Sequence, residues 1–107
     1  MLDLRWRPRA HLDRESIAIY LGFECGNPDA ALAAIRGIDA ALERVCAFPD
    51  GGGHLRIEEL AHSDYRKAYA DPYVIVYRFD AEAVTVYRIL HQRQNLDTYS
   101  LADLPPQ

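Results

Sequence analysis

Two apolar runs in the last third of the chain, Tyr73-Val-Ile-Val-Tyr-Arg-Phe79 and Val84-Thr-Val-Tyr-Arg-Ile-Leu-His91, decide the fold. Only Asp80-Ala-Glu-Ala83 separates them. β-Branched and aromatic residues occur on both faces of each run, which predicts two strands in the centre of a sheet. The second run ends in His91-Gln-Arg93, a cluster of hydrogen-bonding side chains. Such a strand end either presents functional groups or runs out into a solvated loop, and the pattern leaves both interpretations open.

The first half of the chain predicts one strand and two helices. Residues Leu2–Trp6 alternate between apolar and charged side chains, as a half-buried strand does. Pro8 suits the first turn of a helix, which is expected to extend to Phe23. A second helix begins at Asn27-Pro28, because Asn is a strong N-cap, and ends at Phe48-Pro49. The short break between the helices predicts an antiparallel hairpin.

The segment after the helices completes a predicted α+β domain. Pro49–Gly53 is interpreted as a plain connector, since a phosphate-binding glycine loop needs a strand before it and a helix after it. A strand is expected at Leu55–Leu60, whereas Ala61–Tyr69 is either a long turn or more of the sheet. A short helix is a further expectation at Thr98–Leu104. The fold class is α+β in a single domain, residues 1–107: an N-terminal strand, an antiparallel helical hairpin and a three-stranded antiparallel meander, all strands forming one sheet.

Composition excludes several classes of function. The chain carries 12 basic and 16 acidic residues, a net charge of −4, which argues against non-specific binding to nucleic acid. No apolar run has membrane-spanning length, and the N-terminus lacks the features of a secretory signal. Cys25 and Cys46 do not occur at metal-binding spacing, so we expect buried or half-buried thiols in a reducing cytoplasm and no metal or cofactor.

Short motifs recur along essentially the whole chain in this element order. They are Ala10-x-x-Asp13-x-x-x-Ile17-x-x-Tyr20-Leu21, Asn27-Pro28, Phe48-Pro49-x-Gly51, Glu59-Leu60, Asp64-Tyr-Arg-Lys67, Tyr73-x-Ile-x-Tyr-Arg78 and Val86-x-Arg88-Ile-Leu-His-x-Arg93. Together they resemble the RelE/ParE toxin superfamily of bacterial type II toxin–antitoxin modules, also known as plasmid stabilisation systems. The helical motifs are similar to those of the ParE-like branch in particular.

The resemblance implies a toxin that a cognate antitoxin neutralises by wrapping around it. ParE-like members inhibit DNA gyrase by binding it, and RelE-like members cleave messenger RNA on the ribosome. The gyrase inhibitor is therefore the expected function, with the mRNA interferase as the alternative and a homodimer or a toxin–antitoxin hetero-oligomer as the expected assembly. We also expect an apolar groove between the hairpin and the sheet, which the antitoxin covers through apolar burial and β-strand addition.

An interferase would need cations, a base and a donor around the scissile phosphate. The resemblance implies four catalytic candidates, relevant only to that alternative: Arg66, His91, Arg93 and Tyr99. Two positions depart from the RelE pattern, because Val74 and Asp64 stand where that pattern has cations. Arg78 is expected on the same side of its strand as Val74, where it could replace the missing charge. A purely structural role, in which His91 and Arg93 tie the C-terminal segment to the sheet, stays open.

Overall fold

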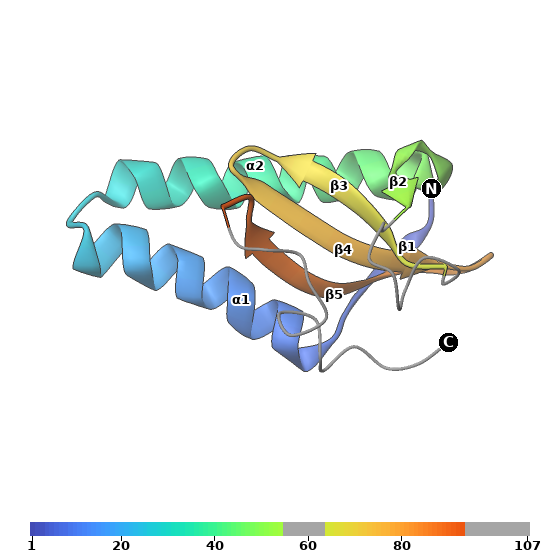
Figure 1. Cartoon of the computed structure of the whole chain (residues 1–107), viewed down its shortest axis with the longest axis horizontal. Coiled ribbons are helices and arrows are strands. Elements are labelled where there is room, and N and C mark those ends of the chain that lie inside the picture. The colour runs from blue at the N-terminus through green and yellow to red at the C-terminus, as the bar shows by residue number, and fades with distance from the viewer. Residues whose placement is uncertain (55–63, 94–107) are drawn as a thin grey trace.

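A computed structural model describes residues 1–54 and 64–93, which form two helices and a five-stranded sheet (Figure 1). The predicted strand at Leu55–Leu60 and the predicted helix at Thr98–Leu104 lie outside the described residues. The elements in chain order are β1 (Asp3–Trp6), α1 (Pro8–Ile19), a π-helical turn (Tyr20–Glu24), α2 (Pro28–Ala47), a 3₁₀ turn (Pro49–Gly51), β2 (Gly53–His54), β3 (Arg66–Ala70), β4 (Tyr73–Phe79) and β5 (Ala83–His91).

The sheet has the strand order β1-β5-β4-β3-β2. Strands β3, β4 and β5 form an antiparallel meander, in which β4 and β5 occupy the expected central positions. The sequence left the structure of Ala61–Tyr69 open. The first strand of the meander, β3, begins within this stretch at Arg66 and ends one residue after it, at Ala70. The sheet as a whole is mixed, because β1 pairs in parallel with β5.

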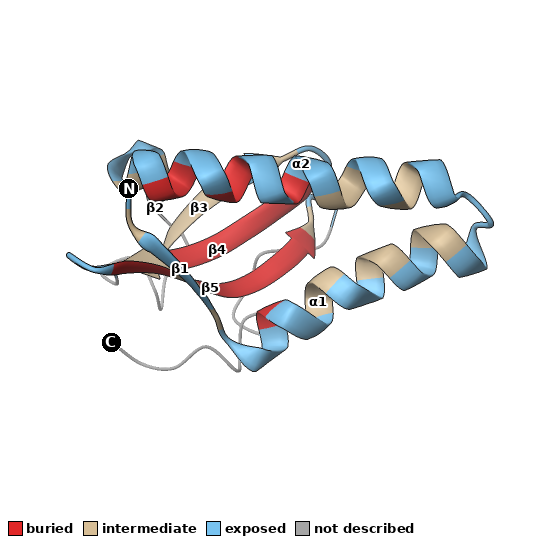
Figure 2. Cartoon of the chain, turned by 180° about the vertical axis from the view of Figure 1, so that it is seen from behind, coloured by how far each residue is buried: buried red, intermediate tan, exposed pale blue. Residues whose placement is uncertain are grey.

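The two helices run antiparallel, side by side, against one face of the sheet (Figures 1 and 2). Asn27 caps α2 as predicted, since its side-chain oxygen accepts a hydrogen bond of 3.0 Å from Ala30 N. Gly26 has φ of 61°, a conformation that favours glycine and permits the sharp turn between the helices. The first helix is shorter than expected: α-helical geometry ends at Ile19, and the remaining residues up to Glu24 form a π-helical turn.

The core lies between α2 and the central strands, as the buried residues in Figure 2 show. Ile38 and Leu42 of α2 pack against Ile75 of β4 and Val86 of β5, and all four are almost completely buried. Burying a side chain of this size contributes about 1.5–3 kcal/mol. Of the two free thiols, Cys46 is buried as expected, but Cys25 is exposed because it follows the π-helical turn at the tip of the hairpin.

Asp13 of α1 joins the first helix to β5 where β1 ends. The pairing of β1 with β5 stops at Val86, whose carbonyl accepts a hydrogen bond from Arg7 N at 2.9 Å. Farther along the same strand, Asp13 Oδ2 accepts hydrogen bonds from Ile89 N at 2.9 Å and from Arg88 Nε at 2.8 Å. The Asp13 and Arg88 side chains are only 12% and 8% exposed. A buried carboxylate thus pairs with a buried guanidinium and also satisfies a strand-edge amide.

We expect Asp13→Asn to lower the free energy of unfolding by about 3 kcal/mol, because it leaves the Arg88 charge buried without its carboxylate partner. Chemical denaturation monitored by circular dichroism measures this difference. Asp39→Asn is the control, since the Arg14–Asp39 pair on the helix surface is half exposed and its loss should cost less than about 1 kcal/mol. Equal losses of unfolding free energy in both variants would show that the buried pair contributes no more to stability than the surface pair.

Candidate functional site

The first candidate site lies where β5 ends. The imidazole of His91 packs edge-on against the ring of Tyr73, with the ring centroids 5.6 Å apart. His91 Nδ1 accepts a hydrogen bond of 3.0 Å from Arg93 N, so this nitrogen is an acceptor and the chain turns back immediately after the strand. Arg93 itself is exposed. The strand end therefore holds the imidazole in place and presents a guanidinium to solvent.

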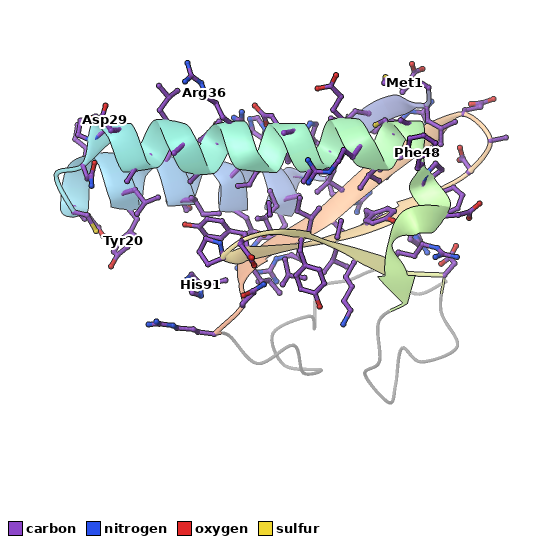
Figure 3. The ribbon with its side chains drawn as sticks, turned by 90° about the horizontal axis from the view of Figure 1, so that it is seen from above. Met1, Tyr20, Asp29, Arg36, Phe48 and His91 are labelled. Atoms are coloured by element: carbon purple, nitrogen blue, oxygen red, sulfur yellow. The ribbon has the colours of Figure 1, made fainter. Side chains whose placement is uncertain are left out.

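A groove of about 630 Å³ between α1 and β5 adjoins this strand end. Tyr20 and His91 lie near the same end of the molecule in Figure 3. Burial raises the pKa of the Tyr73 phenol, so this side chain remains un-ionised at neutral pH. The lining residues are Arg9, Asp13, Ser16, Ile17, Tyr20, Tyr73, Arg88, Ile89, Leu90 and His91.

The candidates for mRNA cleavage do not gather at this groove. Arg66 lies beside Tyr77 on β4, whereas His91 lies beside Tyr73 at the other end of that strand. With about 3.3 Å per residue and about 4.8 Å per strand, the Cα atoms of Arg66 and His91 are roughly 16 Å apart. Arg66 Nη1 also donates to Gly52 O at 2.7 Å, which holds the side chain at its own end of the sheet. Tyr99 lies outside the described residues.

Arg78 does not replace the missing cations. Its guanidinium lies between two aromatic rings, 4.7 Å from the centroid of Tyr65 and 4.9 Å from that of Tyr87. It donates a hydrogen bond of 2.8 Å to the Tyr87 hydroxyl and pairs with Asp64 at 3.5 Å. Tyr73 and Ile75 of β4 pack in the core against the helices. Val74 and Arg78 alternate with them, so both point to the opposite face of the sheet, on the same side as each other as expected. Arg66 pairs across from Tyr77 and faces the helices, so these two guanidinium groups lie on different faces.

A second candidate site lies between α2 and β3, beside the glycine connector. This groove, which we call the α2–β3 groove, has a volume of about 480 Å³. It was expected from the fold in general terms, but the sequence did not identify its residues, because they come from α2, the glycine connector and a strand that sequence patterns left open. The lining residues are Ala41, Arg44, Val45, Phe48, Gly51, Gly52, Gly53, Lys67, Ala68 and Tyr69.

The glycine connector forms one wall of the α2–β3 groove and is fixed to the sheet. The hydroxyl of Tyr77 donates to Pro49 O at 2.8 Å, and burial raises the pKa of this phenol. A Cβ atom on Gly52 would overlap the Tyr77 hydroxyl and would lie 2.8 Å from Lys67 O. The hydrogen bond from Tyr77 therefore fixes the connector to the sheet. The connector passes so close to the Tyr77 hydroxyl that position 52 requires a glycine.

No metal site or membrane span occurs in the described part of the chain. Within residues 1–54 and 64–93, no group of three or more His, Cys, Asp and Glu side chains is placed to hold a metal ion. Neither helix in these ranges combines the length and the apolar character that crossing a membrane requires.

Comparisons with known proteins identify a family. Residues 4–96 match the family model described as the ParE toxin of the type II toxin–antitoxin system parDE. The fold is similar to a solved chain from the chromosomal ParDE TA system of P. aeruginosa, with a TM-score of 0.64 and 18% identity over 85% of this chain and 96% of that one. Among curated protein sequences, none matches the chain.

We expect Gly52→Ala to destabilise the fold by about 1–3 kcal/mol, because the added methyl group displaces the Tyr77 hydroxyl or the β3 backbone. Thermal unfolding measures the loss. Gly51→Ala is the matched control, since a Cβ atom there meets nothing within 4 Å. If both variants unfold at the same temperature as the wild type, the connector is not packed as described.

Proposed function

Because this chain belongs to the family of ParE toxins of type II toxin–antitoxin systems, we propose that it inhibits DNA gyrase by binding it, with no catalytic step of its own. The chain is the toxin component of such a system, and its partner is a cognate antitoxin. A toxin–antitoxin hetero-oligomer is the form in which we expect the neutralised protein. A gyrase target fits the family that the sequence matches.

One observation supports binding over catalysis: the side chains that an mRNA interferase would need are dispersed. Arg66 is fixed to the connector, Arg78 is enclosed between two rings on the other face, and His91 is roughly 16 Å from Arg66. Groups that stabilise one phosphorane must all lie within hydrogen-bond distance of it, and each missing donor costs about 2–4 kcal/mol. This dispersion favours a function that depends on surface recognition.

We propose the end of β5 as the surface that contacts the target. Arg93 is exposed, forms no ion pair within the described residues, and follows a strand end whose direction His91 fixes through the Arg93 amide. A guanidinium offers five donors in a fixed plane, which makes arginine frequent at the energetic centres of interfaces. We therefore expect the contact with the target to depend on the charge of Arg93 more than on the imidazole of His91.

Two assays on the purified chain separate the competing targets. We expect inhibition of gyrase-catalysed supercoiling in the absence of ribosomes, and relief of that inhibition by the cognate antitoxin. The parallel assay is primer extension on a translated message, comparing the wild type with Arg66→Ala and Tyr99→Phe. Strong cleavage in the ribosomal A site that either substitution abolishes, without any effect on supercoiling, would replace the gyrase proposal with the interferase alternative.

We expect Arg93→Ala to raise the concentration that half-inhibits gyrase by about tenfold, the equivalent of about 1.4 kcal/mol of lost binding energy. His91→Ala should have a smaller effect, because it removes a positioning group and not the contacting charge. Supercoiling assays over a range of toxin concentrations measure both. A loss in His91→Ala that equals the loss in Arg93→Ala, together with pH-dependent RNA cleavage, would instead identify His91 as a catalytic base.

A further inference from the structure

We propose that two copies of this chain dimerise through the exposed side of the first helix, with their α1 helices packed antiparallel across a twofold axis. The contact surface consists of Leu12, Ser16, Ile19 and Phe23, which we call the α1 stripe. This inference goes beyond the proposed function and does not depend on a gyrase target. Three observations carry it: the spacing of the stripe, the opposite charges at its two ends, and the apolar area that it offers.

The first helix buries little of its own surface. Among the residues of α1, all of which the structure describes, only Ala10 is buried, and with Ile17 it packs against the core (Figure 2). On the other side of the helix, Leu12 and Ile19 have 56% and 54% of their surface accessible, and Phe23 in the π-helical turn has 83%. A helix on the surface of a globular protein normally turns its apolar side inward. The α1 stripe is therefore apolar surface that a partner can cover.

The residues of the α1 stripe follow the spacing of a coiled coil. Steps of four, three and four residues separate positions 12, 16, 19 and 23, which makes them successive d and a positions over two heptads. A seam with this spacing fits the side chains of another helix. An isolated helix of this length would be marginal in water, but Asp13 already holds α1 against β5. The partner therefore meets a helix that is already formed.

The stripe is complementary to itself when two copies run antiparallel. In that arrangement Leu12 faces Phe23 of the partner subunit, and Ser16 faces Ile19 of the partner subunit. Ser16 is small and exposed, so it leaves room for the larger isoleucine side chain. A twofold axis repeats both contacts, because the interface of a twofold dimer uses the same patch of each subunit. A second copy of the chain thus supplies the helix that the stripe fits.

Charge favours the antiparallel direction. Arg9, at the start of α1, has a side chain that is 56% exposed, and Glu24 is exposed at the other end of the stripe. Arg9 and Tyr20 line the same groove, and Glu24 lies one turn beyond Tyr20, so all three flank the stripe on one side. Antiparallel packing brings Arg9 beside Glu24 of the partner subunit, twice in each dimer. Parallel packing would bring like charges together at both ends.

The area of the stripe sets the expected strength of the dimer. Tyr20, beside the stripe, is 55% accessible, and together with Leu12, Ile19 and Phe23 it offers roughly 500 Å² of surface per copy. Two copies would bury about 1,000 Å², which is the lower limit for a specific interface between proteins. We therefore expect a weak dimer, with a dissociation constant on the order of 10 μM.

The test measures self-association of the full chain, without other proteins, by sedimentation equilibrium over a range of concentrations. We expect Leu12→Glu to weaken the dimer at least about tenfold, because the new carboxylate meets Phe23 and Glu24 of the partner subunit. Leu32→Glu is the matched control, since Leu32 of α2 is 49% accessible and lies outside the stripe. Its dimer should stay within about threefold of the wild type. Circular dichroism of each variant confirms that the comparison is between folded proteins.

Disulfide cross-linking tests the direction of the helices. The background is Cys25→Ser, which removes the exposed thiol and leaves the buried Cys46. A mixture of Leu12→Cys and Phe23→Cys proteins should form a cross-linked dimer under mild oxidation, because these positions face each other. Leu12→Cys alone should not, since the two copies of position 12 in an antiparallel pair are roughly 16 Å apart, beyond the reach of a disulfide. Cross-linking of Leu12→Cys with itself, and none in the mixture, would contradict the antiparallel dimer.

Other occupants of the stripe are distinguishable outcomes. A wild type that stays monomeric at several hundred micromolar, well above the dissociation constant expected for an interface of this area, would overturn the proposal. If Leu12→Glu then weakened binding of the antitoxin or inhibition of gyrase, the stripe would belong to that partner. A dimer that Leu12→Glu leaves intact would place the interface elsewhere and overturn the proposal too. Failure of the gyrase proposal looks different, because the supercoiling assay would show no inhibition while sedimentation still reported the dimer.

Discussion

The carboxylate of Asp13 is the contact on which the arrangement of helices and sheet depends. Strand β1 pairs with β5 only from Asp3 to Trp6, so the second half of β5 would otherwise have an unpaired edge. Asp13 accepts a hydrogen bond from the Ile89 amide and neutralises Arg88. The first helix thus takes the place of a neighbouring strand along this part of β5. A carboxylate this buried is stable only with a partner charge and hydrogen bonds. The pair therefore specifies where α1 lies as well as contributing to stability.

The position of α1 beside the end of β5 distinguishes two regions of this strand, one on each side of a bulge. Tyr87 of β5 has no partner in the pairing with β4, which skips from Arg88 to Val86, and a bulge of this kind bends a strand. Beyond the bulge, β5 leads to His91 and Arg93 beside α1. Before it, the sheet lies beneath the C-terminal half of α2, next to the connector and the α2–β3 groove. The bulge thus divides β5 between the part that lies beside α1 and the part that lies beneath α2.

The sequence predicted the elements that carry their own local signal. The β-branched and aromatic content of Tyr73–Phe79, the Asn27 cap and the apolar spacing along α2 are local features, and the structure has these elements where they were expected. The strand β3 was harder, because Arg66-Lys-Ala-Tyr-Ala70 contains no β-branched residue and becomes a strand through its pairing with β4. The Asp13–Arg88 contact joins residues 75 positions apart, and no local pattern indicates it.

The same distinction explains what could be inferred about the sites. An acidic chain suggested that charge would contribute little to recognition of a partner, because net charge was the only electrostatic quantity that the sequence provided. In the structure several carboxylates near the sheet already neutralise an arginine, namely Asp50 with Arg66, Asp64 with Arg78 and Asp13 with Arg88. Interactions between exposed charges are screened beyond about 8–10 Å in physiological salt, so a partner senses the local charge and not the total. The net charge of a chain therefore does not determine the charge of any one part of its surface, because pairing with carboxylates neutralises some cations and not others.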